Sequence, residues 1–92
     1  MIQSFRSADT QPLFEGRAVP RFANIRTVVD RKLLMLDSAP SLNSLRSPPG
    51  NRLEALRGDR AGQYSIRIND QWRVCFVWTD DGPAQVEIVD YH

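Results

Sequence analysis

Two strand-like segments, 63–68 and 72–78, are separated by only three residues, and this arrangement constrains the fold more than any other feature. Apolar residues recur at every second position along one face of both segments: Tyr64, Ile66, Ile68, Trp72, Val74, Phe76 and Trp78. A three-residue loop at 69–71 pairs these positions with one another, whereas a two-residue loop would pair Arg67 with Trp72 and mix the faces. The pattern therefore predicts an antiparallel hairpin with one continuous apolar face.

The same register places Arg67 directly opposite Arg73 on the other face of the hairpin. Like charges in that position destabilise a strand pair by up to about 1 kcal/mol. Either an acidic neighbour on the last strand, Asp90 or Glu87, compensates the two arginines, or an anionic ligand such as a phosphate group does. The residues alone leave both explanations open.

The rest of the chain predicts an α+β fold. We expect a short N-terminal strand and two helices packed on a three- to four-stranded antiparallel sheet. The expected elements are a strand at Ile2–Phe5, a helix from Asp9 or Thr10 to about Gly16, a helix at 22–38, a loop at 39–51 with a turn at 42–45, a strand at 52–56 and a last strand at 84–91. A length of 92 residues predicts a single domain over 1–92.

The formal net charge of +1 conceals an uneven distribution. Residues 46–73 carry six arginines against three acidic residues, while residues 74–92 carry four acidic residues and no Lys or Arg. Lys32 is the only lysine among the 12 basic residues. Arginine's planar fork suits bidentate contact with phosphate, so the central arginine-rich stretch is a candidate anion-binding region.

Composition also limits the chemistry and the location. Cys75, the only cysteine, lies within an apolar run and is expected to be a buried, inert thiol. One cysteine and one histidine, His92, are too few good ligands for a metal site, and we expect neither a metal nor a cofactor. The absence of an apolar run of about 20 residues argues against a membrane span, and the first residues lack a secretory signal, which predicts a cytoplasmic protein.

The sequence ends in the triplet Asp90-Tyr91-His92, which follows a predicted strand. Histidine is the side chain whose ordinary pKa lies near neutrality, and tyrosine can stack on a base. These residues alone do not distinguish a functional triplet from a frayed end.

Three motifs together are specific: the turn RGDRAG at 57–62, the hairpin loop NDQWR at 69–73 and the terminal VDYH at 89–92. With them the chain resembles, over nearly its whole length, the HigB-type toxins, also called plasmid-maintenance killer proteins, of the RelE superfamily. The resemblance implies a RelE-like fold and a ribosome-dependent endoribonuclease that cuts mRNA in the decoding site. It also implies neutralisation by a HigA-like helix-turn-helix antitoxin, through which alone the toxin would reach operator DNA.

The family's functional positions fall on Arg73, Arg57 and the terminal triplet. Some relatives have lysine in place of Arg57 and histidine in place of Glu54, and Glu54 can instead accept a proton or pair with Arg52. Arg73 and Arg57 are the candidates for stabilising the phosphorane, and His92 for general acid or base catalysis. We expect Asp90 to orient His92 or take a proton, and Tyr91 to stack or assist.

The remaining candidates for RNA binding are Arg67, Arg60 and Arg52. Two other interpretations stay open at this stage: a gyrase-inhibiting toxin of the ParE type, and a non-catalytic module that binds RNA or the ribosome.

Overall fold

A computed structural model describes residues 1–90 of the chain. The α-helices are α1 (Thr10–Phe14) and α2 (Arg26–Ser38), and the strands are β1 (Glu54–Ala55), β2 (Tyr64–Arg67), β3 (Trp72–Thr79) and β4 (Gly82–Asp90). Four short 3-10 helices complete the list: η1 (Pro20–Ile25), η2 (Asn43–Arg46), η3 (Pro49–Asn51) and η4 (Gly58–Arg60). Within residues 1–90, no helix is long and apolar enough to cross a membrane.

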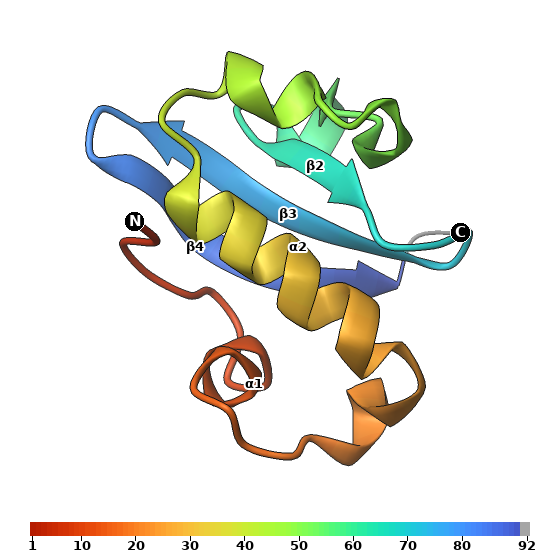
Figure 1. The fold of residues 1–92 in the computed structure, drawn as a ribbon. Coiled ribbons are helices and arrows are strands. Elements are labelled where there is room, and N and C mark those ends of the chain that lie inside the picture. Colours follow the sequence, from red (N-terminus) through yellow and green to blue (C-terminus); the bar gives the residue numbers. More distant parts are fainter. Residues whose placement is uncertain (91–92) are drawn as a thin grey trace.

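The four strands form one antiparallel sheet in the order β1-β2-β3-β4, and α2 lies across one face of it (Figure 1). The predicted hairpin register is confirmed, since Tyr64 pairs with Phe76, Ile66 with Val74 and Arg67 with Arg73. The α+β class and the two helices on an antiparallel sheet are confirmed as well.

The N-terminal segment is less regular than the expected strand at Ile2–Phe5. It runs beside the outer edge of β4, where Phe5 makes a single parallel bridge with Val86 and the Gln3 amide donates to the Pro83 carbonyl at 2.7 Å. A bulge in β4 explains the short ladder, because the pairing with β3 shifts there and Gln85 has a φ of 52°.

Two other boundaries differ from those expected. The strand expected at 52–56 is reduced to Glu54–Ala55, because Arg52 adopts the left-handed conformation with φ 46° and ψ 53°, which cannot continue a strand. The helix expected at 22–38 begins as the 3-10 helix η1 and becomes α-helical only at Arg26. The turn expected at 42–45 is present as η2, at Asn43–Arg46.

The hydrophobic core lies between α2 and the sheet. It is formed by buried residues from both layers, among them Phe22, Val29, Leu33, Leu36, Ile66, Val74, Phe76, Val86 and Ile88. Phe22 and Trp72 meet edge to face, with ring centroids 5.5 Å apart. Helix α1 is tied to the sheet by Thr10, whose buried hydroxyl accepts from the Ile88 amide at 3.1 Å. The helix side of the sheet is therefore closed, and polar side chains gather on the opposite side.

Candidate functional site

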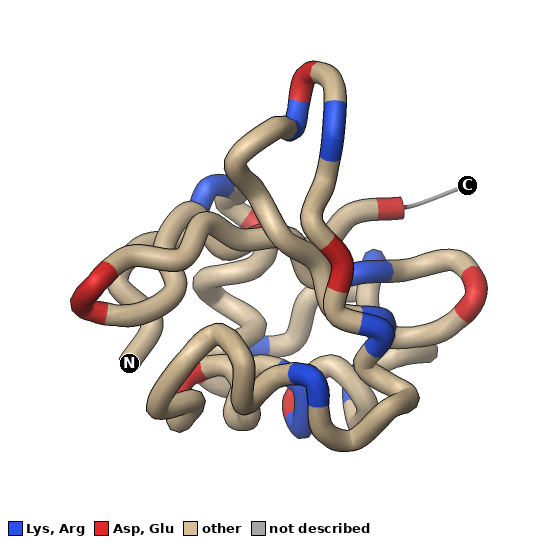
Figure 2. The backbone as a smooth tube through the Cα atoms, turned by 90° about the horizontal axis from the view of Figure 1, so that it is seen from above, with Lys and Arg blue, Asp and Glu red and all other residues tan. Residues whose placement is uncertain are grey.

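The sheet face turned away from α2 carries the candidate site, which we call the polar face. The strand register places six residues of β2, β3 and β4 on it: Ser65, Arg67, Arg73, Cys75, Glu87 and Val89. Lys and Arg positions lie close to Asp and Glu positions at several places along the backbone (Figure 2).

Arg73 is the most buried charged residue of the polar face and is only 8% exposed. Its Nε donates to the Ser65 hydroxyl at 2.7 Å, and its Nη2 donates to the Arg52 carbonyl at 2.7 Å. Two directional bonds on different edges of the guanidinium fix the orientation of its plane. Arg73 is therefore a rigidly held cation, unlike an ordinary surface arginine.

Arg67, which lies opposite Arg73, forms an ion pair with Asp70 of the hairpin loop. The acidic compensation for Arg67 thus comes from Asp70 of the hairpin loop, a residue that the prediction of Asp90 or Glu87 does not include. Glu87 instead accepts from Arg60, and Asp90 accepts from the Gln71 side chain at 3.2 Å.

The structure does not place Asp90 beside Arg73. Asp90 pairs with Trp72 in the register, whereas Arg73 pairs with Val89. Residues directly opposite one another share a face, so Asp90 lies on the helix side of the sheet at the end of β4. Tyr91 and His92, the other members of the predicted triplet, lie outside the described residues.

Arg60 connects the turn at 57–62 to the sheet. Its Nη1 donates to Glu87 at 2.8 Å and to the Gln63 side chain at 3.1 Å, and the Glu87 carboxylate also lies 3.8 Å from Arg6 Nε. Arg60 is predicted to contact RNA, and in the structure it forms an ion pair with Glu87. The ion pair between Arg60 and Glu87 could be anticipated only from the alternation along the last strand, which places Glu87 on the polar face.

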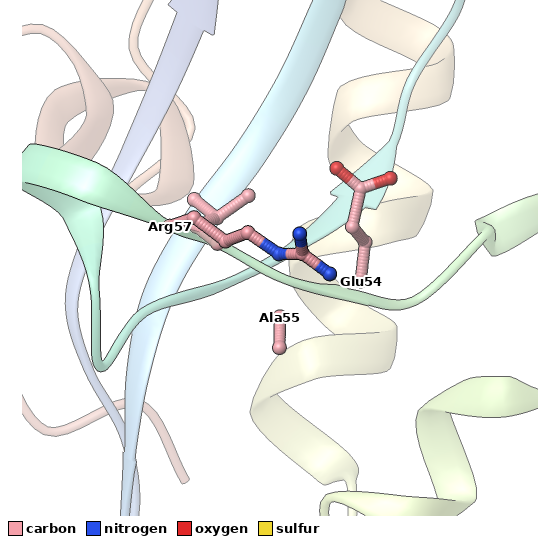
Figure 3. A pocket seen from close by; sticks show the side chains of 4 residues that line it. Glu54, Ala55 and Arg57 are labelled. Carbon is pink, nitrogen blue, oxygen red and sulfur yellow. The ribbon is translucent and has the colours of Figure 1, made fainter.

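Arg57 is exposed and lies immediately before η4. It lines an open hollow of about 470 Å³ with Glu54, Ala55 and Leu56, and its guanidinium points toward Glu54 (Figure 3). The ion pairs found within residues 1–90 do not include the expected alternative between Glu54 and Arg52. Arg52 itself is exposed and contributes its carbonyl to Arg73.

Cys75 is fully buried, as predicted. Burial raises the pKa of its thiol, so that the neutral form predominates near neutral pH. The polar face therefore offers no thiolate nucleophile.

Two buried polar residues, Lys32 and Asn51, are not among the site residues predicted from the sequence. Lys32 of α2 is 7% exposed and donates to the side-chain carbonyl of the fully buried Asn51. Burial lowers the pKa of Lys32, and the charges of Arg31 and Arg67 lower it further. Lys32 lies three residues after Val29 and so falls on the apolar stripe of α2. This spacing is the sequence feature that indicates its burial.

Two solved structures show a similar fold. A YafQ mutant from E. coli aligns with a TM-score of 0.65 and 14% identity, covering 98% of this chain and 91% of that one. The YoeB–YefM complex from Staphylococcus aureus aligns with a TM-score of 0.62 and 18% identity, covering 100% of this chain and 98% of the other. At these identities the likeness defines the fold alone.

Comparison of the amino-acid sequence with known proteins identifies the family of this chain. Residues 5–92 match the family model described as a RelE-like toxin of type II toxin-antitoxin system HigB. The chain is 43% identical over 76 residues to Toxin HigB-1 of Vibrio cholerae serotype O1, covering 83% of this chain and 77% of that protein. It is 30% identical over 95 residues to Endoribonuclease HigB of Proteus vulgaris, covering all of both chains. The chain belongs to the HigB family of type II toxins.

Proposed function

We propose that this toxin is an endoribonuclease that inhibits translation by cutting mRNA in the ribosomal A site. The observation that carries the proposal is the rigidly held guanidinium of Arg73 on the polar face. A full-length relative bears the name Endoribonuclease HigB, which supports the same chemistry for this chain.

Cleavage of RNA requires three contributions from the protein: deprotonation of the 2′-hydroxyl, stabilisation of the phosphorane dianion and protonation of the 5′-oxygen. We assign the electrostatic part to Arg73 and to the exposed Arg57. A cation that is already oriented stabilises the developing charge without the cost of reorganising at the moment of reaction. Arg67, Arg60 and Arg52 are assigned to the RNA backbone.

Proton transfer is assigned to the terminal triplet. His92 has the side chain whose ordinary pKa suits a general acid or base near neutral pH. Because Asp90 lies on the helix side of the sheet, its proposed role is to orient the chain end rather than to contact the phosphate beside Arg73. Tyr91 is assigned to stacking on a base. All of these steps use side chains alone.

A toxin of a type II system has a protein antitoxin as its partner. We further propose that this antitoxin is a HigA-like helix-turn-helix protein, and that the toxin reaches operator DNA only through it. The ribosome is the proposed second partner, since it would orient the mRNA against a site with few catalytic groups. The proposed location is the cytoplasm, where translation takes place.

The test is translation-coupled cleavage of a reporter mRNA on programmed ribosomes. Arg73→Ala should slow cleavage by about 100-fold or more, the scale of losing one preorganised charge donor. Arg17→Ala, which removes an exposed arginine far from the site in sequence, should cleave at the wild-type rate. Undiminished cutting by Arg73→Ala would refute the assignment, and inhibition of gyrase supercoiling with intact mRNA would favour the ParE-type alternative.

A further inference from the structure

One of the hydrogen bonds that hold Arg73 goes to a residue in an unusual backbone conformation. The backbone carbonyl of Arg52 accepts this bond from Arg73 Nη2 at 2.7 Å, and the Arg52 side chain takes no part in it. Arg52 is also left-handed, with φ 46° and ψ 53°. For a residue with a side chain this conformation costs about 1–2 kcal/mol, so the surroundings must hold it in place.

Asn51 supplies the nearest of these constraints. It is fully buried, and its Nδ2 donates to the Leu45 carbonyl at 3.0 Å and, more weakly, to the Ser47 carbonyl at 3.4 Å. The backbone N–H of Asn51 also donates to the Pro48 carbonyl at 3.0 Å. Asn51 thereby fixes the end of η3 immediately before the left-handed residue.

Lys32 fixes the other end of the Asn51 side chain. The Lys32 ammonium donates to Asn51 Oδ1. The oxygen of the Asn51 side-chain amide is therefore held by Lys32, while its nitrogen is held by backbone carbonyls. A buried ammonium is costly to retain, and the lowered pKa of Lys32 reflects that cost. An apolar residue would fill the same position on the stripe of α2 without this cost.

We propose that Lys32 and Asn51 are positioning residues for Arg73. Together they hold the left-handed turn at Arg52, and the carbonyl of that turn orients the guanidinium on the polar face. The path runs from α2 through η3 to β3, and neither Lys32 nor Asn51 touches the RNA. This inference rests on the proposed function, because it assigns Arg73 its catalytic role.

A double-mutant cycle separates positioning from general structural support. Asn51→Ala should slow single-turnover cleavage at saturating ribosomes by about 10- to 100-fold, the scale of a misplaced catalytic group, and change KM less than two-fold. In an Arg73→Ala background, the same Asn51→Ala change should alter the remaining slow rate less than two-fold. Slowing by the same factor in both backgrounds would overturn the proposal.

Lys32 provides a second route that does not depend on the folding of the Asn51 variant. Lys32→Gln retains an N–H donor for Asn51 Oδ1, whereas Lys32→Met does not. We expect Lys32→Met to slow cleavage at least about 10-fold and Lys32→Gln to recover most of that loss. Arg31→Met is the matched control, because it removes a neighbouring exposed charge from the same helix and should cleave at the wild-type rate. Equal rates for Lys32→Met and wild type would overturn the proposal.

Proton exchange at Arg73 Nε gives a readout that is independent of cleavage. In the wild type this proton is bonded to the Ser65 hydroxyl, and NMR should detect it as slowly exchanging with solvent. In folded Lys32→Met the exchange should be at least about 10-fold faster, as expected for a loosened hydrogen bond. Unchanged exchange in Lys32→Met would count against positioning.

The two proposals fail in different ways. Wild-type cleavage by Arg73→Ala would refute the proposed catalytic role. An inactive Arg73→Ala, together with unchanged rates and unchanged Nε exchange in the Asn51 and Lys32 variants, would refute the positioning role alone.

Discussion

The two faces of the central sheet are both buried in part, but they are held by different forces. The helix side contains fully buried apolar residues such as Ile66, Val74 and Phe76 packed against α2. The polar face contains Arg73, which is 8% exposed, and Ser65, which is fully buried, joined by hydrogen bonds of defined geometry.

This difference separates stability from activity. Apolar burial is non-directional and scales with the area removed from water, so the helix side contributes most of the free energy of folding. Hydrogen bonds contribute less net stability, but they fix orientation. We therefore expect substitutions on the helix side to lower the free energy of unfolding, and those on the polar face to lower the cleavage rate more than the stability.

The largest expected effect is on the helix side. Phe76→Ala should lower the free energy of unfolding by about 3–5 kcal/mol, because it removes a fully buried ring and leaves a cavity. Urea denaturation followed by circular dichroism measures the change. Val77→Ala is the matched control on the next residue of β3, which is only partly buried, and should cost about 1 kcal/mol. Equal losses for the two variants would contradict the comparison.

The helix side was also the more predictable of the two faces. The alternation at 63–68 and 72–78 was enough to determine the hairpin register, because a shift of one residue would have exposed the whole apolar set. The pairing of Arg67 with Arg73 followed from that register without further information.

The polar face was predicted only in part, because its contacts join distant segments. Arg73 and Arg52, whose carbonyl accepts from Arg73, are separated by 21 positions, and Arg60 and Glu87 by 27. The left-handed conformation of Arg52 shortened the expected strand at 52–56, and a non-glycine residue gives no local signal for it. The opposite faces of Asp90 and Arg73 followed from the register of β4, which the sequence pattern alone did not determine.

An intermediate effect is expected at Ser65. Ser65→Ala removes the hydroxyl that accepts from Arg73 Nε and should lower the free energy of unfolding by about 1–3 kcal/mol, the cost of a buried donor without that partner. The cleavage rate on ribosomes should fall about 10-fold, since one of the hydrogen bonds that orient the guanidinium is lost. Ser38→Ala, an exposed serine on α2, is the control and should leave the rate unchanged. A loss of stability with a normal rate would show that orientation of Arg73 does not limit cleavage.

The smallest effect is expected at Glu87, where the polar face meets solvent. Its side chain is 16% exposed, but its partners Arg60 and Arg6 are 35% and 52% exposed, so solvent and salt screen the pairs. Glu87→Gln keeps the shape and an acceptor for Arg60, and should lower the free energy of unfolding by no more than about 1 kcal/mol. The difference from wild type should shrink when urea denaturation is repeated in high salt. A salt-independent loss as large as that of Phe76→Ala would mean that ion pairs stabilise the polar face as strongly as apolar packing stabilises the helix side.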